Sequence, residues 1–177
     1  MLLGWFFLSL ILWLWIFTFV TDAPRESKIV LFVNTPACRE TELAVALEED
    51  RPEAIRMVQV HAFNWAAMST DPLIWSDLYI VRSSDIPDCL EWFAPLPEEL
   101  AASGECYLSG GIPVGLKVRS SADGSAVASS FFTWTAENAP GEDYWLFFGK
   151  RSLHLSGNPD AVDDHAVPIA KKLLSLP

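Results

Sequence analysis

Residues 1–20 are uncharged and almost wholly apolar, reading MLLGWFFLSLILWLWIFTFV. Each of the 12 basic and 23 acidic side chains lies beyond Thr21. A helix of this length rises about 30 Å, which matches the hydrocarbon core of a bilayer. We therefore expect a single-pass transmembrane anchor over residues 1–21, contact with the membrane through residues 1–20, and a polar linker over residues 22–27.

Two other interpretations of this segment stay open. A cleaved signal peptide would use Thr21-Asp22-Ala23 as its small-residue site, but secretory signals have shorter apolar cores and a basic leader. The true start could also lie upstream of Met1. Arg25 and Lys28 follow the apolar segment, so the positive-inside count favours a cytoplasmic C-terminal portion.

The rest of the 177-residue chain is enough for one domain, with a net charge of −11. Nucleic acid is not an expected partner, because binding phosphates requires a basic face. Three cysteines are too few for a disulfide-rich scaffold. A bridge between Cys89 and Cys106 remains open if the domain is extracytoplasmic, and Cys38 would then be left over.

The first half of the domain alternates strands with helices. Residues 28–33, 55–60 and 77–81 are apolar and of strand length. A helix is predicted from Thr35, as N-cap, to about residue 50, and a short helix over residues 64–68. This alternation predicts a three-layer α/β unit with a mostly parallel sheet.

The second half adds a helix and a hairpin. We expect a helix over residues 84–93 and a hairpin of residues 105–108 and 112–118 around Gly110-Gly111. Two further segments, residues 127–135 and 143–148, are prone to form strands. A C-terminal helix should start near Asp163 and pack on the sheet. The fold class is therefore α/β, with an N-terminal transmembrane helix followed by one lobe over residues 28–177.

Polar residues follow two of the strands that we expect to be parallel. Asn34 and Thr35 follow the first strand, while Arg82 and Ser83 follow the third. Open α/β sheets bind ligands at the carboxyl ends of parallel strands, so we take these residues as candidate ligand contacts. Trp65 is added as an aromatic face on which a sugar could stack, as are Trp75, Trp92 and Tyr144.

We find no catalytic signature, cofactor motif or metal-ligand spacing, and we expect a non-catalytic protein without a cofactor. The histidines at positions 61, 154 and 165 form no i, i+4 pair. No nucleophile elbow or phosphate-binding glycine loop is present. Cys38 near a helix start is interpreted as an ordinary small buried residue rather than a reactive thiol.

Four segments occur in the order found in a known family. A "PDxxxx" strand, an "LxPL" segment, a "dGkxyGlP" hairpin and an "alxYNK" strand are matched by residues 76–81, 93–96, 109–116 and 144–150. Over residues 28–150 the chain thus resembles the first lobe of an extracellular solute-binding protein of sugar ABC transporters. Complete members have two lobes and bind ligand between them. This chain ends about where the second lobe would start, so no closing cleft is expected within it.

The resemblance implies a membrane-tethered lobe outside the cytoplasm, and we prefer this placement to the one given by the charge count. The expected function is recognition of a small solute or a partner protein without catalysis, at the cell membrane. The alternative is an interaction or assembly subunit of a membrane protein complex, with the apolar segment packed beside other transmembrane helices.

Overall fold

The computed structural model describes residues 2–21, 23–35, 38–62, 73–132 and 141–177. Its helices are α1 (Leu2–Thr21), α2 (Glu40–Glu48), α3 (Ile86–Cys89), α4 (Glu98–Ala101) and α5 (Ala166–Ser175). Its strands are β1 (Lys28–Val33), β2 (Met57–Ala62), β3 (Leu78–Arg82), β4 (Cys106–Ser109), β5 (Ile112–Arg119) and β6 (Tyr144–Phe148). Short 3-10 helices connect several of these elements, at Arg25–Ser27, Leu73–Trp75, Ser83–Asp85, Leu90–Trp92 and Ser129–Phe131.

The strands form one sheet in the order β2-β1-β3-β6-β5-β4. β1 pairs in parallel with both β2 and β3, which confirms the parallel unit expected from the first half of the sequence. The other half of the sheet is antiparallel, because β6 returns beside β3 and the β4–β5 hairpin adds to it. The expected hairpin is confirmed, with Gly110 and Gly111 at φ of 58° and 86° in its turn.

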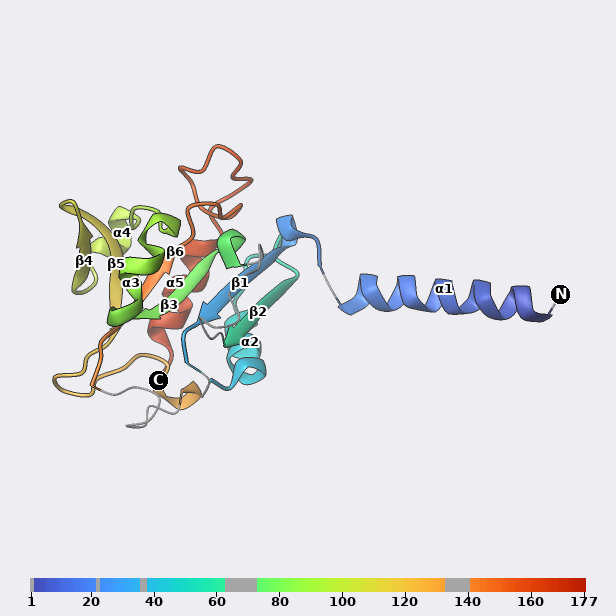
Figure 1. Cartoon of the computed structure of the whole chain (residues 1–177), viewed down its shortest axis with the longest axis horizontal. Coiled ribbons are helices and arrows are strands. Elements are labelled where there is room, and N and C mark those ends of the chain that lie inside the picture. Colours follow the sequence, from blue (N-terminus) through green and yellow to red (C-terminus); the bar gives the residue numbers. More distant parts are fainter. Residues whose placement is uncertain (1, 22, 36–37, 63–72, 133–140) are drawn as a thin grey trace.

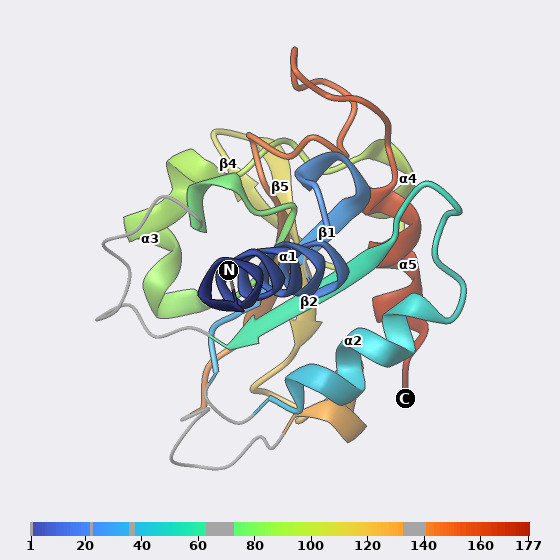
Figure 2. The same cartoon turned by 90° about the vertical axis from the view of Figure 1, so that its right-hand side faces the viewer.

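Two apolar clusters lie on opposite faces of the sheet and make the lobe three-layered. Ile29, Leu31 and Val33 of β1 pack with residues of α2 and α5 in one cluster. Phe32 belongs to the other cluster, which includes Ile86 and residues of β3 and β6. Figure 2 shows α2 and α5 on one side of the sheet and α3 on the other. The alternation of side chains along β1 therefore produces the two covered faces.

α1 extends away from the lobe as a separate rod (Figure 1). Its side chains are described for residues 4–17, and all of them are exposed. Among the described residues, none of the helices is both long and apolar enough to cross a membrane. The transmembrane helix expected over residues 1–21 is therefore not supported by the structure and stays a prediction.

The helix expected with Thr35 as its N-cap begins four residues later, with Arg39 as its N-cap. Thr35 is buried, its amide donates to the Val33 carbonyl at 2.9 Å, and Arg39 rather than Thr35 occupies the N-cap position of α2. Cys38 instead pairs with Phe132 in an isolated bridge, and α2 begins only after it, at Glu40. The second strand is shifted as well, from residues 55–60 to 57–62, because the Ile55 amide donates to the Pro52 carbonyl in a turn.

Two other expected elements are wrong as stated. The helix over residues 84–93 is broken into α3 and two 3-10 turns, since Cys89 leaves the helical region at φ −129°. Residues 127–132 do not form a strand, because Ala128 adopts a left-handed φ of 51° and leads into a 3-10 turn. The helix expected over residues 64–68 lies outside the described residues. The C-terminal helix is confirmed as α5, whose buried side chains join the core.

Candidate functional site

The carboxyl edge of β1 and β3 brings two of the predicted site residues together on a third residue. The side-chain amide of Asn34 donates to Asp85, and the Arg82 Nε donates to the same carboxylate oxygen at 2.5 Å. The Asn34 backbone amide donates to the Ile80 carbonyl at 2.8 Å, which fixes the end of β1 against β3. Asn34 and Arg82 are thus held in place by Asp85.

Asp85 was missed by the sequence analysis. It is 8% exposed and lies just before α3, where its place ahead of Pro87 resembles that of an ordinary capping residue. Hydrogen bonding to Asp85 raises the pKa of Arg82 above its usual value. The Arg82 side chain is 37% exposed, so its charge is fixed on one side by a carboxylate and accessible to solvent on the other.

The remaining predicted residues do not join this cluster. The Ser83 hydroxyl accepts from the Trp145 indole at 2.9 Å and donates to the Asp143 carbonyl at 3.2 Å, so Ser83 fastens the end of β3 to the start of β6. Thr35 is 1% exposed and lies beneath the surface. Trp65 lies outside the described residues. Of the five predicted ligand contacts, the structure therefore brings Asn34 and Arg82 together.

A second charged group borders this edge. Lys117 of β5 bridges Glu105 and Asp143, each at 2.8 Å, and its ammonium lies 4.8 Å from the centre of the Trp145 ring. The hydrogen bond from Lys117 and others from Ser121 lower the pKa of Asp143 to about 2. Asp143 is therefore ionised at neutral pH, and this end of β6 is anchored by charge.

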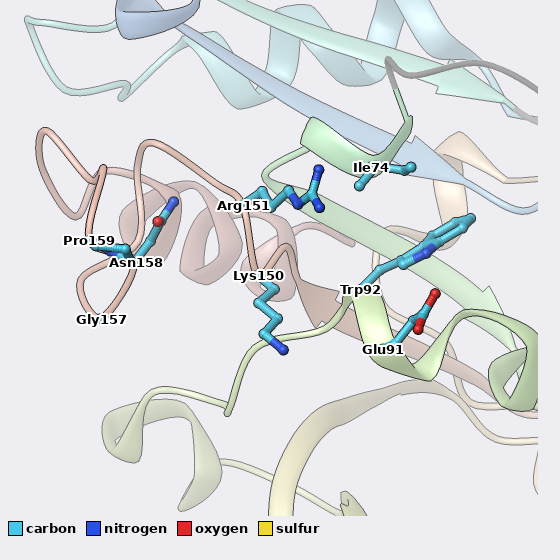
Figure 3. Close-up of a pocket in the computed structure, with 8 residues that line it drawn as sticks. All are labelled: Ile74, Glu91, Trp92, Lys150, Arg151, Gly157, Asn158 and Pro159. Atoms are coloured by element: carbon cyan, nitrogen blue, oxygen red, sulfur yellow. The ribbon is translucent and has the colours of Figure 1, made fainter.

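The opposite edge of the sheet carries a hollow of about 500 Å³ (Figure 3). Lys150 and Arg151, just after β6, line the hollow together with Trp92 and Glu91; the Arg151 guanidinium extends toward Ile74, and the segment Gly157–Pro159 lies on the side away from Trp92. β6 leads here because it is antiparallel to β3, with Phe148 opposite Leu78. The volume of the hollow lies within the range of small-ligand sites, and the hollow combines an aromatic wall with basic groups.

Next to this hollow, two guanidinium groups lie over the Trp75 ring. Arg25 lies 4.7 Å from the centre of its ring, and Arg151 lies 4.8 Å from it. The Arg25 guanidinium also donates to the Trp75 carbonyl at 3.5 Å. The 3-10 turn of Trp75, the residues following α1 and the residues following β6 therefore meet at one place.

A buried polar network supports this edge from inside. The Asp77 carboxylate accepts from the Val30 amide at 2.8 Å and the Ser152 hydroxyl at 2.6 Å. Burial raises the pKa of Asp77, although both hydrogen bonds oppose this. Because Asp77 lies at the start of β3, the network joins β1, β3 and the chain after β6.

His154 continues the network toward α1. Its Nδ1 lies 2.8 Å from Asp163 and its Nε2 lies 3.0 Å from the carbonyl oxygen of Arg25. Burial lowers the pKa of His154. The two hydrogen bonds and the charges of Asp77 and Asp163 raise this pKa by more than burial lowers it, so the net shift is upward. Both ring nitrogens face acceptors, which favours the doubly protonated ring.

The described cysteines do not form the disulfide that the sequence left open. Cys38, Cys89 and Cys106 are all free thiols. The Cys89 and Cys106 thiols instead contact the carbonyl oxygens of Asp85 and Ala101, each at 3.3 Å. Burial raises the pKa of both Cys38 and Cys89 to about 12, which disfavours the reactive thiolate. Among the described residues, no group of three or more His, Cys, Asp or Glu side chains is arranged to hold a metal ion.

No protein-family model matches the chain, and neither a curated protein nor a solved structure was found to match it.

Proposed function

We propose that this chain is a membrane-anchored, non-catalytic binding domain outside the cytoplasm, which recognises a small solute at the carboxyl edge of β1 and β3. The observation that carries the proposal is the convergence of Asn34 and Arg82 on Asp85 at that edge. Parallel α/β sheets bind ligands at this position because the chain ends of neighbouring strands meet there.

The order of elements supports the likeness to one lobe of a solute-binding protein. A strand, a helix and a strand are followed by a third parallel strand, a helical segment, a hairpin and a returning strand, as the resemblance implies. The uncharged residues 1–20, followed at once by the linker to β1, support the membrane anchor. This likeness concerns the fold, and the site residues must be tested separately.

The chemistry of the edge favours a ligand rich in acceptor oxygens. Arg82 presents a guanidinium, which binds carboxylates and hydroxyl groups through several N–H donors. Asp85 fixes the direction of that group, and the nearby Trp145 ring is available only at its margin because it is 7% exposed. A sugar or a small carboxylic acid fits these groups better than an apolar molecule.

Ligand-induced thermal stabilisation of the full chain in detergent tests the proposal. The panel contains sugars, amino acids and short peptides. A compound of the panel that binds, supplied at about 100 times its own Kd, should stabilise the fold by about 2.7 kcal/mol. For a domain of this size, that corresponds to a rise in Tm of about 5–11 °C. No shift across the panel, together with co-purification of a membrane complex, would favour the assembly-subunit alternative instead.

Two arginine variants separate the site from general charge effects. Arg82→Gln should abolish the ligand-induced shift, since it removes the guanidinium at the edge. Arg51→Gln is the matched control, because Arg51 also pairs with an acid three residues away and its side chain is 38% exposed, against 37% for Arg82. Equal shifts in the two variants would contradict a binding role for Arg82.

The extracytoplasmic placement needs its own test. Residues 121–125 lie in an exposed turn of the lobe, so Ala122→Cys, in a background with the three native cysteines replaced by alanine, provides a labelling site. An impermeant thiol reagent should label it on intact cells. Labelling only after lysis would place the lobe in the cytoplasm, as the charge count alone predicts, and would remove the solute-binding analogy.

A further inference from the structure

The amino edge of the sheet gathers basic side chains in an otherwise acidic chain. Arg25 and Lys28 stand just before and at the start of β1, and Lys150 and Arg151 follow the returning strand β6. Arg25 and Lys28 line two hollows together with Trp75, and Lys150 and Arg151 line the hollow of Figure 3 together with the neighbouring Ile74. Four of the 12 basic residues thus lie at this edge of a protein with net charge −11.

Several acids also lie near this surface. Glu91 lines the hollow opposite Arg151, and Glu26 follows Arg25 in the chain. Asp77 is buried beneath the edge and is held by the Val30 amide and the Ser152 hydroxyl. Farther along the segment after Pro159, Asp160 and Asp164 are exposed and Asp163 pairs with His154 and His165, so the positive charge is local to the Trp75 stack and the hollow.

This edge is also the part of the lobe tied most closely to α1. Arg25 follows Thr21, the last residue of α1, by four residues, which span at most about 14 Å of extended chain. Both Arg25 and Arg151 stack on the Trp75 ring. If α1 is the membrane anchor, the Trp75 stack lies within reach of the bilayer surface.

Indole and basic side chains together are typical of the membrane–water interface. Tryptophan rings are enriched at the level of the lipid headgroups, and lysine and arginine are attracted to anionic lipids. Trp75 is 38% exposed even though two guanidinium groups lie over its ring. The hollow in Figure 3 adds Lys150 and Arg151 around a space of about 500 Å³, which can admit a phosphate-bearing headgroup.

We propose that this amino edge docks on anionic lipid headgroups, with Trp75, Arg25, Lys150 and Arg151 as the contact residues. The inference rests on the proposed membrane anchor. Docking holds the lobe with its amino edge against the bilayer. The carboxyl edge with Asn34 and Arg82 then faces away from the membrane, toward solute.

Hydrogen exchange of the full chain in lipid nanodiscs tests the docking. One set of nanodiscs contains only phosphatidylcholine, and the other contains phosphatidylcholine with phosphatidylglycerol. Amides of residues 73–77 and 150–159 should exchange about threefold or more slowly in the anionic nanodiscs, because docking shields this edge. Amides of β4 and β5, which are remote from α1, should exchange equally in both.

A charge reversal at the edge is compared with one at a distance. Arg151→Glu should abolish the lipid-dependent protection. Arg39→Glu, an exposed arginine at the start of α2, is the matched control and should retain it. In a third arm, glycerol 3-phosphate added to the chain in detergent tests whether a soluble anion occupies the same hollow.

The outcomes separate this inference from the function proposed above. Equal exchange in the two kinds of nanodisc, or equal loss in both variants, would overturn docking while leaving the solute site intact. Protection of the same amides by glycerol 3-phosphate in detergent, without lipid dependence, would show a soluble-anion site instead. A chain that does not enter either nanodisc would overturn the membrane anchor and the docking together.

Discussion

Gly149, at the turn that ends β6, is a position where a single methyl group should damage the fold. A Cβ added there would lie 1.9 Å from the Ser76 carbonyl oxygen. This contact is with backbone, so no side chain can rotate away to relieve it. The Gly149 amide also donates to the Asp77 carbonyl at 2.8 Å, and Gly149 pairs with Phe93 in an isolated bridge.

The cost of Gly149→Ala follows from these contacts. To reach 3.0 Å, below which real Cβ atoms are essentially never found, the two segments must separate by about 1.1 Å. Overpacking of this kind costs about 1–3 kcal/mol, and a buried backbone hydrogen bond that is lost costs about 1–3 kcal/mol. We expect a loss of about 3 kcal/mol in the free energy of unfolding, or a fall in Tm of about 6–12 °C.

Thermal and urea unfolding of the full chain in detergent measure this loss. Gly104→Ala is the control, because a Cβ there meets only the flexible end of the Leu116 side chain, at 3.2 Å. If Gly149→Ala unfolds within about 0.5 kcal/mol of the Gly104→Ala control, the close approach of β6 to the start of β3 is not as described.

Three further predictions concern single side chains. Urea unfolding of the wild type and of His154→Gln measures the stability that His154 contributes. Because the pKa of His154 is higher in the folded state than in the unfolded state, this stability should be fully present below the unfolded-state pKa near 6.5. It should be lost as pH rises through the folded pKa, and a difference that does not vary with pH would contradict this. Asp85→Ala should cost about 1–2 kcal/mol in urea unfolding, because it leaves Asn34 and Arg82 without their shared acceptor; a neutral change would refute that role. Cys38 and Cys89 should react with a thiol reagent at pH 7.5 at under about a hundredth of the rate of a free cysteine, and rapid labelling of either in the folded chain would contradict its raised pKa.

β1, β6, the hairpin and the last helix could be predicted because their signals are local. The apolar runs of residues 28–33 and 144–148 correspond to β1 and β6, which are buried within the sheet. Gly110-Gly111 marked the hairpin, and the apolar face after Asp163 marked α5. In each case the pattern of a few neighbouring residues was enough to specify the element.

The elements that differ depend on contacts with distant parts of the chain. Thr35 has the chemistry of an N-cap, but Cys38 pairs with Phe132, nearly a hundred residues away, and this delays α2. Ala128 takes a left-handed conformation while its amide donates to the Leu176 carbonyl at 3.0 Å. Neither pairing has a signal in the surrounding sequence.

The candidate site was predicted in part for the same reason. Asn34 and Arg82 lie at the ends of parallel strands, and this position in the sequence correctly predicted that the two residues lie close together. It could not select Asp85, whose role follows from how the chain turns after β3, and it could not show that Ser83 is turned toward Trp145. The hollow at Lys150 and Arg151 was missed because it depends on where β6 ends.

β6, like the neighbouring β3, links the two edges of the sheet within five residues. It has five residues, all buried, and spans about 17 Å. Near its first residues the Trp145 indole is fixed to Ser83, and beyond its last residue the chain continues into Lys150 and Arg151. The length of this buried strand therefore fixes the separation between the Trp145 end and the basic side chains at the other end.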